Sequence, residues 1–399
     1  MLIILCLSAL AAAAGVHFLL KGQLNRFYSA SRAELSAGAP GSLIRAEPLD
    51  IDLNGARAWR VLYRSTGVKG QPVAVSGVIV APDAPAPAGG YPVIAWAHPT
   101  TGLASRCAPS LLPHFAATVP ALPDLIARGY VVTATDYEGL GTQGPHPYLV
   151  GISAAHSVLD SVRAADALAQ TSGKFAVWGH SQGGHAALWT GKLAGAYAPD
   201  RSLQGVIAAA PATELSALFE DDLATAGGKV FTTLALLSWA DVYHLDLDHV
   251  LRPEALPSAH IMANACMTGP VGLFLDSIAL RILPNQFLKE DPTKVEPWRD
   301  IIAHNTPGDL PPEVPIFIAQ GTGDGVVLPR VTRNFAQRLC ASGSSVELLE
   351  MQADHLSIAP LSAEPALDWL ADRLAGKPSA PGCTNVHAPQ PASPSAAKS

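Results

Sequence analysis

The chain has 399 residues, enough for one large α/β domain with insertions, or for two domains, around a sizeable apolar core. Charged residues make up 15% of the chain, against roughly 25% of an average soluble domain, and the formal net charge is −7. No run rich in lysine and arginine stands out, so the composition argues against a nucleic-acid-binding protein.

The N-terminus begins with an apolar run at residues 2–20, which is followed by Lys21. A secretory signal peptide cleaved near residues 11–14 is one interpretation. An uncleaved signal anchor is the other, because the run approaches the ~20 residues that span a bilayer. Cys6 lacks the small preceding residues of a lipoprotein cleavage site. We therefore expect residues 1–30 to be a signal peptide or anchor, and the folded part to be secreted or periplasmic.

Apolar runs and amphipathic stretches alternate along most of the remaining chain. Two β-branched runs joined by a Gly-containing turn, 58–66 and 73–82, predict an antiparallel hairpin. The later alternation predicts βαβ crossovers, and so an α/β fold with a mostly parallel sheet and helices on both faces. The expected strands are 93–98, 131–136, 175–179, 205–211, 315–320 and 346–351, and the expected helices are 122–128, 154–170, the stretch after residue 184, and 363–374.

A long insertion interrupts this alternation at residues 215–310, between two consecutive strands. Its size predicts an α-helical cap or lid over the edge where the strands end, although an ordinary helical subdomain without a gating role is the alternative. The α/β core would then consist of residues 40–214 and 311–385, followed by a Pro-, Ala- and Ser-rich, disordered tail at 386–399. The helix-like pieces of the insertion are 215–226, 229–240 and 273–283.

The most informative motif lies at residues 175–184, where an apolar run ends in Gly-x-Ser-x-Gly and a helix-like stretch follows. A serine at such a reversal sits on a strained turn with its hydroxyl exposed, and the new helix directs free N–H groups at a developing oxyanion. Gly179 and Gly183 fit a close approach of strand and helix. Ser181 is therefore the candidate nucleophile, and the alternative is a Gly-rich turn that happens to contain serine.

An acid and a base follow the motif in a suitable order. A serine hydroxyl needs a base within hydrogen-bond reach, and the base needs an orienting carboxylate. Asp324 and His355 each follow a predicted strand, in the order serine, acid, histidine. Asp354 is the rival acid, but a residue adjacent to the base rarely reaches its Nδ1. Asp324 could also be a plain turn residue; we expect it to be the acid and His355 to be the base.

An oxyanion hole needs two backbone N–H donors. We expect one at Gln182, the residue after the nucleophile. The second is expected in the loop after strand 93–98, at Thr101 or Thr100, with Gly102 as a further alternative.

Most of the 13 histidines are expected to be surface or core residues. His180 lies within the motif and is expected to line the pocket or to pack beside it, whereas His98 closes a strand and is interpreted as structural. The segment His244–His249 combines histidines and aspartates, but its spacing matches no established metal site. No metal and no cofactor is predicted.

Four cysteines remain besides Cys6: Cys107, Cys266, Cys340 and Cys383. An even number in an exported chain favours two disulfides over free thiols. Spacing alone leaves all three pairings open, and the absence of a Cys-x-x-Cys pair argues against a zinc site or a redox dithiol.

With Ser181, Asp324 and His355 placed, the chain resembles the secretory lipase family, the α/β-hydrolases of the fungal lipase A type and their bacterial relatives. The resemblance runs from about residue 45 to residue 385. Besides the serine motif it includes Cys107–Ser110, Asp136–Gly141, Pro147–Leu149, Ser157–Asp160 and Val162–Ala164.

The resemblance implies an exported serine hydrolase that acts on carboxylic esters of lipids, with a helical cap and no cofactor. It also implies pairing of Cys107 with Cys266, which would tie the oxyanion loop to the cap, and of Cys340 with Cys383. The chain departs from the family pattern at two points. It has Thr100 and Thr101 where fungal members place an acid, and Gln182 where they commonly place glycine, so the second oxyanion donor and the acyl-length preference stay open.

We therefore expect a lipase or carboxylesterase. The alternatives are an esterase, thioesterase or peptidase acting on another acyl substrate, or a non-catalytic binding protein with the same fold. The expected partners are a lipid or small ester substrate and, through the cap, a transient lipid interface. The sequence does not predict an oligomeric state.

Overall fold

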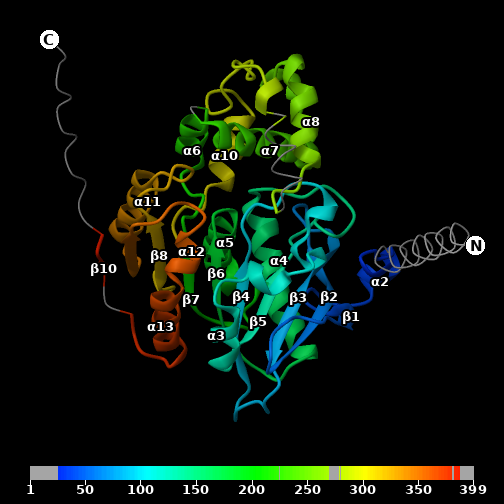
Figure 1. Cartoon of the computed structure of the whole chain (residues 1–399), viewed down its shortest axis with the longest axis vertical. Helices are drawn as coiled ribbons and strands as arrows, with labels where there is room; N and C mark the ends of the chain where they lie inside the picture. The colour runs from blue at the N-terminus through cyan, green and yellow to red at the C-terminus, as the bar shows by residue number, and fades with distance from the viewer. Residues whose placement is uncertain (1–25, 224, 269–277, 279, 380–381, 387–399) are drawn as a thin grey trace, which may run out of the picture.

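A computed structural model of the chain describes residues 26–223, 225–268, 278, 280–379 and 382–386 (Figure 1). Within these residues, ten strands form one sheet in the order β1-β2-β3-β5-β4-β6-β7-β8-β9-β10. The pairs β1–β2, β2–β3 and β3–β5 are antiparallel, and the other pairs are parallel. The strands are β1 Leu43–Pro48, β2 Ala56–Thr66, β3 Pro72–Pro82, β4 Tyr91–Ala97, β5 Val131–Thr135, β6 Thr171–His180, β7 Ser202–Ala209, β8 Ile316–Gly321, β9 Val346–Met351 and β10 Cys383–Thr384.

Helices cover both faces of the sheet and bury two apolar layers. On one face α4 (Gly151–Ala164), α5 (Gln182–Tyr197) and α11 (Pro329–Ala341) pack against the strands. On the other face α3 (Leu122–Ala127) and α13 (Ala363–Leu374) do so. The short helix α12 (Ile358–Leu361) adds Ile358 and Ala359 to the second layer, whereas α2 (Arg32–Ser36) has no buried residue. The predicted mostly parallel α/β architecture is therefore confirmed.

The predicted hairpin is confirmed as β2 and β3, and most other predicted strands and helices lie within a few residues of their expected positions. The helix expected at 154–170 is displaced: α4 begins at Gly151, ends at Ala164 and passes into a short 3-10 turn, because β6 already begins at Thr171. The strand expected to end at residue 211 ends at Ala209, because Ala210 has a positive φ of 41°.

The insertion between β7 and β8 forms a helical layer at the carboxyl ends of the parallel strands (Figure 1). Its helices are α6 (Leu215–Asp222), α7 (Ala226–Tyr243), α8 (Leu256–Asn264) and α10 (Trp298–Asn305). Trp239 and Phe219 of this layer belong to the same apolar cluster as Leu149 and Val327 of the core loops. The helix expected at 273–283 falls mostly outside the described residues.

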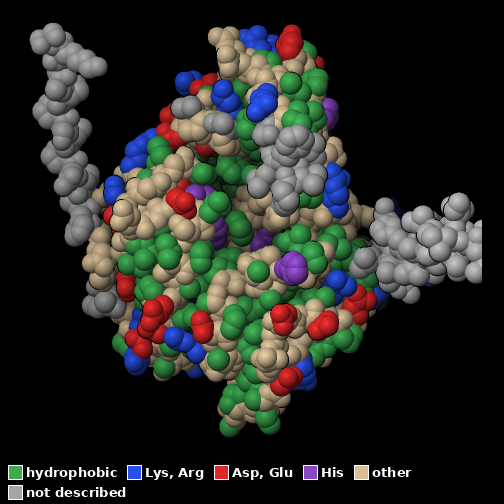
Figure 2. Space-filling view, viewed as in Figure 1, with side chains coloured by type: hydrophobic (Ala, Val, Ile, Leu, Met, Phe, Trp, Pro, Cys, Tyr) green, Lys and Arg blue, Asp and Glu red, His purple; other side chains and the backbone are tan. Residues whose placement is uncertain are grey.

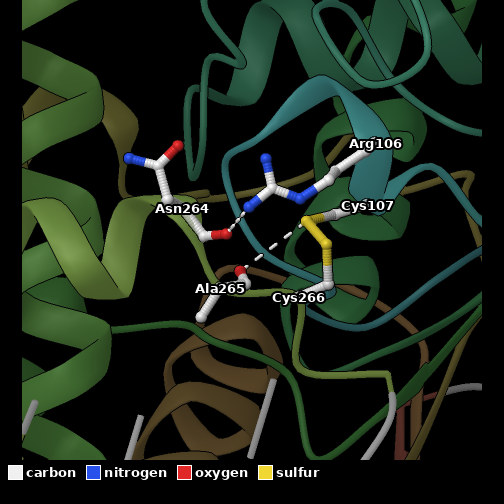
Figure 3. Close-up of a disulfide and its surroundings, with 5 residues drawn as sticks. All are labelled: Arg106, Cys107, Asn264, Ala265 and Cys266. Atoms are coloured by element: carbon white, nitrogen blue, oxygen red, sulfur yellow. Dashed lines mark hydrogen bonds between the residues drawn. A yellow bond between two sulfur atoms is a disulfide. The ribbon is translucent and has the colours of Figure 1, made fainter. Parts of the chain in front are cut away.

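Two disulfides are present, with the pairing that the family resemblance implied. Cys340 at the end of α11 pairs with Cys383 of β10. Cys107, in the loop after β4, pairs with Cys266 after α8, and Arg106 donates a hydrogen bond to the carbonyl of Asn264 beside it (Figure 3). The Cys107–Cys266 disulfide therefore joins the loop before α3 to the helical insertion.

The predicted signal segment and tail lie outside the part of the chain that the structure describes, except for residues 26–30 and 386. In the described part, no helix combines the length and apolar character that crossing a membrane requires.

Candidate active site

Ser181 occupies the turn between β6 and α5, with φ 57° and ψ −116°. Such a positive φ is strained for a residue with a side chain. The turn is fixed because the N–H of Ser181 donates to Ala209 on β7, at 2.9 Å. A Cβ on Gly179 would lie 1.9 Å from the carbonyl oxygen of Gly183, so strand and helix approach too closely for any other residue there.

The structure brings the predicted nucleophile, base and acid together. His355 Nε2 lies 2.9 Å from Ser181 Oγ, and His355 Nδ1 lies 2.8 Å from Asp324 Oδ2. All three side chains are buried. A neutral ring that donates from Nδ1 to the carboxylate leaves Nε2 free to accept the serine proton, which is the arrangement needed to activate a hydroxyl.

The carboxylate of Asp324 is held by its own loop after β8. Its Oδ1 accepts hydrogen bonds from the N–H groups of Val326 and Val327, at 2.8 and 2.9 Å. The amide of Gln320 donates to Oδ2. Asp354, the rival acid, instead accepts hydrogen bonds from the N–H and hydroxyl of Ser357. The geometry therefore favours Asp324 as the partner of the base.

His180 lies beside the base, as expected from its place in the motif. Its Nε2 donates to the carbonyl oxygen of His355 at 2.7 Å. Burial lowers the pKa of His180 to about 4, so the ring is neutral and suited to this single donation. His98 has both ring nitrogens within 3.2 Å of the carbonyl oxygens of Pro99 and Asp136, which agrees with its structural interpretation.

The proposed oxyanion residues lie at the start of α5 and in the loop after β4. Gln182 is the first residue of α5, where backbone N–H groups have no partner within the helix. A Cβ on Gly183 would lie 1.8 Å from the carbonyl oxygen of Ala97, so the end of β4 and the start of α5 are in direct contact. Thr101 is buried and its hydroxyl has no partner among the described residues. The Thr100 hydroxyl bonds to that of Tyr148, at 3.0 Å.

Sequence reasoning missed a histidine that fixes Gln182. The side-chain amide of Gln182 donates to Nε2 of His146 at 3.1 Å, and Nδ1 of His146 donates to the carbonyl of Glu138 at 2.8 Å. Burial lowers the pKa of His146 to about 4, which keeps Nε2 available as an acceptor. Its loop carries no periodic pattern, so nothing in the sequence distinguished it.

A pocket opens above Ser181, between the insertion and the sheet. Figure 2 shows the hollow there, with histidine side chains within it. The face of α6 that carries Leu215, Leu218 and Phe219 forms one wall, and Ser181 and Gln182 lie at its base. The other lining residues are Tyr148, Leu149, Ala212, Asp222, Phe231, Val326 and Val327.

Asp222 is a lining residue that sequence reasoning also missed. It follows Leu215, Leu218 and Phe219 at the spacing of one helix face, so the pattern placed a carboxyl on the apolar side of α6. Among the described residues, no three His, Cys, Asp or Glu side chains are grouped to hold a metal. In the segment His244–His249, Nε2 of His244 lies 2.9 Å from the ammonium nitrogen of Lys69.

A mostly parallel sheet, a serine on the turn between β6 and α5, and an acid and a histidine after β8 and β9 define an α/β-hydrolase. More narrowly, the chain belongs to the secretory lipase family, whose family model matches residues 116–382.

Individual relatives agree with this assignment. The chain is 27% identical to the secreted triacylglycerol lipase LIP4 of Malassezia globosa, over 86% of this chain and 79% of that protein. It is 26% identical to the probable inactive lipase MT1628 of Mycobacterium tuberculosis, over 85% and 79%. Candida antarctica lipase A in its closed state has the same fold, with a TM-score of 0.73 and 20% identity over 89% of this chain and 87% of that one.

Proposed function

We propose that this protein is an exported serine hydrolase that cleaves carboxylic esters of lipids, as a lipase or carboxylesterase, through an acyl-enzyme on Ser181. The observation that carries the proposal is the pair of hydrogen bonds that joins Asp324 to His355 and His355 to Ser181 at the base of an apolar pocket. Family membership and the name of the Malassezia globosa relative support lipid esters as the substrate class.

Each side chain has a defined step. Ser181 Oγ attacks the ester carbonyl carbon while His355 Nε2 takes its proton, and Asp324 orients the ring and stabilises its charged form. The tetrahedral intermediate then collapses, and the leaving alcohol takes the proton from Nε2. A water molecule deprotonated by the same nitrogen attacks the acyl-enzyme, releases the acid and restores the serine.

The N–H of Gln182 is proposed as one oxyanion donor, and the N–H of Thr101 as the second, with Thr100 as its alternative. The positive end of α5 supports the first assignment, because it stabilises negative charge next to Ser181. The hydrogen bond between Gln182 and His146 supports it further, since it holds the residue in place.

We further propose that residues 215–310 act as a cap on a core formed by 40–214 and 311–385. Both ends of the insertion are tied to α11, where Arg338 pairs with Glu214 and with Asp309. Opening would therefore involve the helices between these ends. Leu356, next to the base, is 79% exposed. Together with Ile282 of the insertion, which is 52% exposed, this side chain supports the proposed transient contact with a lipid interface.

Export is part of this proposal and is supported by the sequence. The apolar run at residues 2–20 has the character of a signal segment, and the family is secretory. Two disulfides agree with an oxidising compartment.

Hydrolysis of a p-nitrophenyl ester series of rising chain length, run beside triglyceride emulsions, tests the proposal. We expect turnover by the wild type and a loss of order 10³-fold or more in kcat for Ser181→Ala and for His355→Ala. The relative named as an inactive lipase makes this test necessary. Equal activity of the wild type and Ser181→Ala would exclude the mechanism. Binding of the esters without turnover would identify a non-catalytic protein instead.

A further inference from the structure

One carboxyl in the pocket has no task in the proposed mechanism. Asp222 is the last residue of α6, on the same face as Leu218 and Phe219, and these three residues line the pocket that contains Ser181 (Figure 1 shows α6 in the insertion). Asp222 is 9% exposed. A carboxyl in so apolar a wall destabilises the fold unless a partner satisfies it, so its presence calls for a function.

The described residues offer Asp222 no side-chain partner. The charge that acts on it is another carboxylate, Asp221, whose own ion-pair partner is Arg330 of α11. Burial, followed by the charge of Asp221, raises the pKa of Asp222 to about 8. The group is therefore largely neutral at pH 7, with one hydroxyl to donate and one carbonyl oxygen to accept.

A second polar group, the hydroxyl of Tyr148, belongs to the lining of the same pocket. The Tyr148 hydroxyl also contacts that of Thr100, in the loop proposed to supply an oxyanion donor. Asp222 and Tyr148 therefore both line the pocket that contains Ser181, among mostly apolar side chains.

We propose that Asp222 forms a polar subsite that recognises a hydroxyl group carried by the ester substrate. The proposal rests on the proposed ester hydrolase function and specifies its substrate. A hydroxyl both donates and accepts, so it satisfies a carboxyl in either protonation state. A carboxylate ligand would meet like charge from Asp221. An ammonium ligand would lose its hydration against Leu218 and Phe219.

The hydroxyl could belong to the acyl chain or to the alcohol, and paired substrates distinguish the two. The acyl pair consists of the methyl ester of a hydroxylated fatty acid and the methyl ester of the unsubstituted acid. The pair is repeated with the hydroxyl at different positions along the acyl chain. The alcohol pair is a monoacylglycerol and the propyl ester of the same acid. The readout is the ratio of kcat/KM within each pair.

In at least one pair we expect the wild type to prefer the hydroxylated ester by fivefold or more. Asp222→Leu should lower that ratio about tenfold and raise kcat/KM for the unsubstituted ester. The reason is that the wall of the pocket formed by α6 is then apolar throughout. Asp222→Asn keeps a donor and an acceptor and should retain the preference within about threefold. Asp221→Asn, on the same helix, is the matched control and should leave the ratio unchanged.

A second readout needs no turnover. It compares the dissociation constants of the same ester pairs for the Ser181→Ala protein and for the Ser181→Ala/Asp222→Leu protein. Equal ratios for the wild type and Asp222→Leu in both pairs, or an equal loss in Asp221→Asn, would overturn the subsite. If the protein still hydrolyses unsubstituted esters efficiently, and this hydrolysis depends on Ser181, the proposed function would remain intact. No turnover of any ester, with the binding preference present, would overturn the function and keep the subsite.

Discussion

At the residue scale, the reactivity proposed for Ser181 depends on how His355 is oriented. Asp324 fixes one ring nitrogen, and the ring of His180 holds the backbone carbonyl of His355 from the other side. The base is therefore positioned through its side chain and its main chain at once. This double support explains why a loop residue can present its ring at 2.9 Å from a hydroxyl on another loop.

Exchange of the acid for an amide tests this orientation. Asp324→Asn should lower kcat by roughly 10³- to 10⁴-fold, because an amide favours the wrong ring tautomer of His355. Asp354→Asn is the matched control, since its carboxylate lies one residue from the base but accepts hydrogen bonds from Ser357. It should keep kcat within a few-fold. Steady-state kinetics on a short-chain ester measures both, and a larger loss in Asp354→Asn than in Asp324→Asn would contradict the assignment.

The three residues that carry this account were predictable from the sequence because chain order and strand ends constrain them. Ser181 follows an apolar strand, and Asp324 and His355 each follow another. Parallel strands end at one edge, so such residues converge. His146 was not predictable, since it fixes Gln182 from an irregular loop. Asp222 carried a signal, a carboxyl at helical spacing among apolar residues, but its significance depends on the pocket it faces.

At the element scale, the insertion is fastened to the core at points that flank the site. In α7, the Ser238 hydroxyl donates to the carbonyl of His146 and accepts from the N–H of Tyr148. Trp239 of the same helix donates to the carbonyl of Tyr148. Asn305 at the end of α10 accepts, through its carbonyl, from Trp189 and His185 of α5. α7 and α10 are thus fastened to the core loops and to α5, and α6 is fastened to α11 by the ion pair of Asp221 with Arg330.

The two disulfides should have different effects on activity. Each closes a long loop, of 159 residues for Cys107–Cys266 and 43 for Cys340–Cys383. Chain entropy then predicts a loss of roughly 5 and 4 kcal/mol on removal of each bond by double serine substitution. Removal of Cys107–Cys266 should also lower kcat, because Thr101 in the tied loop accepts a hydrogen bond from the N–H of Met267 beside the bond.

Denaturant unfolding and ester kinetics on both double variants check this expectation. Cys340→Ser/Cys383→Ser is the control, because that bond joins the end of α11 to β10, away from the pocket lining. It should lower the free energy of unfolding without a change in kcat/KM. An equal effect of both removals on kcat would show that the first disulfide has no special connection to the site.

At the scale of the whole molecule, the sheet and the order of its elements follow from apolar runs, and most of the deviations have physical causes. β1 was not predicted because it is an edge strand whose residues are half exposed, so no buried pattern marks it. α11 was missed although its apolar residues, Val331, Phe335 and Leu339, recur at the spacing of an amphipathic helix, so this omission was avoidable. β10 has two residues, and it pairs with β9 beside the Cys340–Cys383 bond. Strands such as β1 and β10 depend on tertiary contacts.

Buried histidines should make the stability of the fold fall in acid. Burial lowers the pKa of His185 from 6.5 to about 4, so the unfolded chain binds its proton at a higher pH than the folded chain. The stability that this group contributes is full above pH 6.5 and is lost as the pH falls toward 4. His98, His146 and His180 have the same shift, whereas buried Asp222, with a raised pKa, acts in the opposite direction.

A single variant isolates this effect. Relative to His185→Gln, the wild type should lose on the order of 2 kcal/mol of unfolding free energy between pH 7.5 and pH 5. Glutamine can still donate to the carbonyl of Asn305, the partner of His185 Nε2. Urea titrations at both pH values measure the difference. Parallel pH dependences of the two proteins would contradict a neutral, buried His185.

The central claim is that Ser181 is a nucleophile activated by His355, and covalent labelling tests it most directly. The full-length protein is treated with a fluorophosphonate, and the modified peptide is identified by mass spectrometry. We predict one label per chain on Ser181, strongly slowed labelling in His355→Ala and none in Ser181→Ala. A protein that stays unlabelled while folded, or that carries the label at another residue at the wild-type rate in Ser181→Ala, would contradict the account.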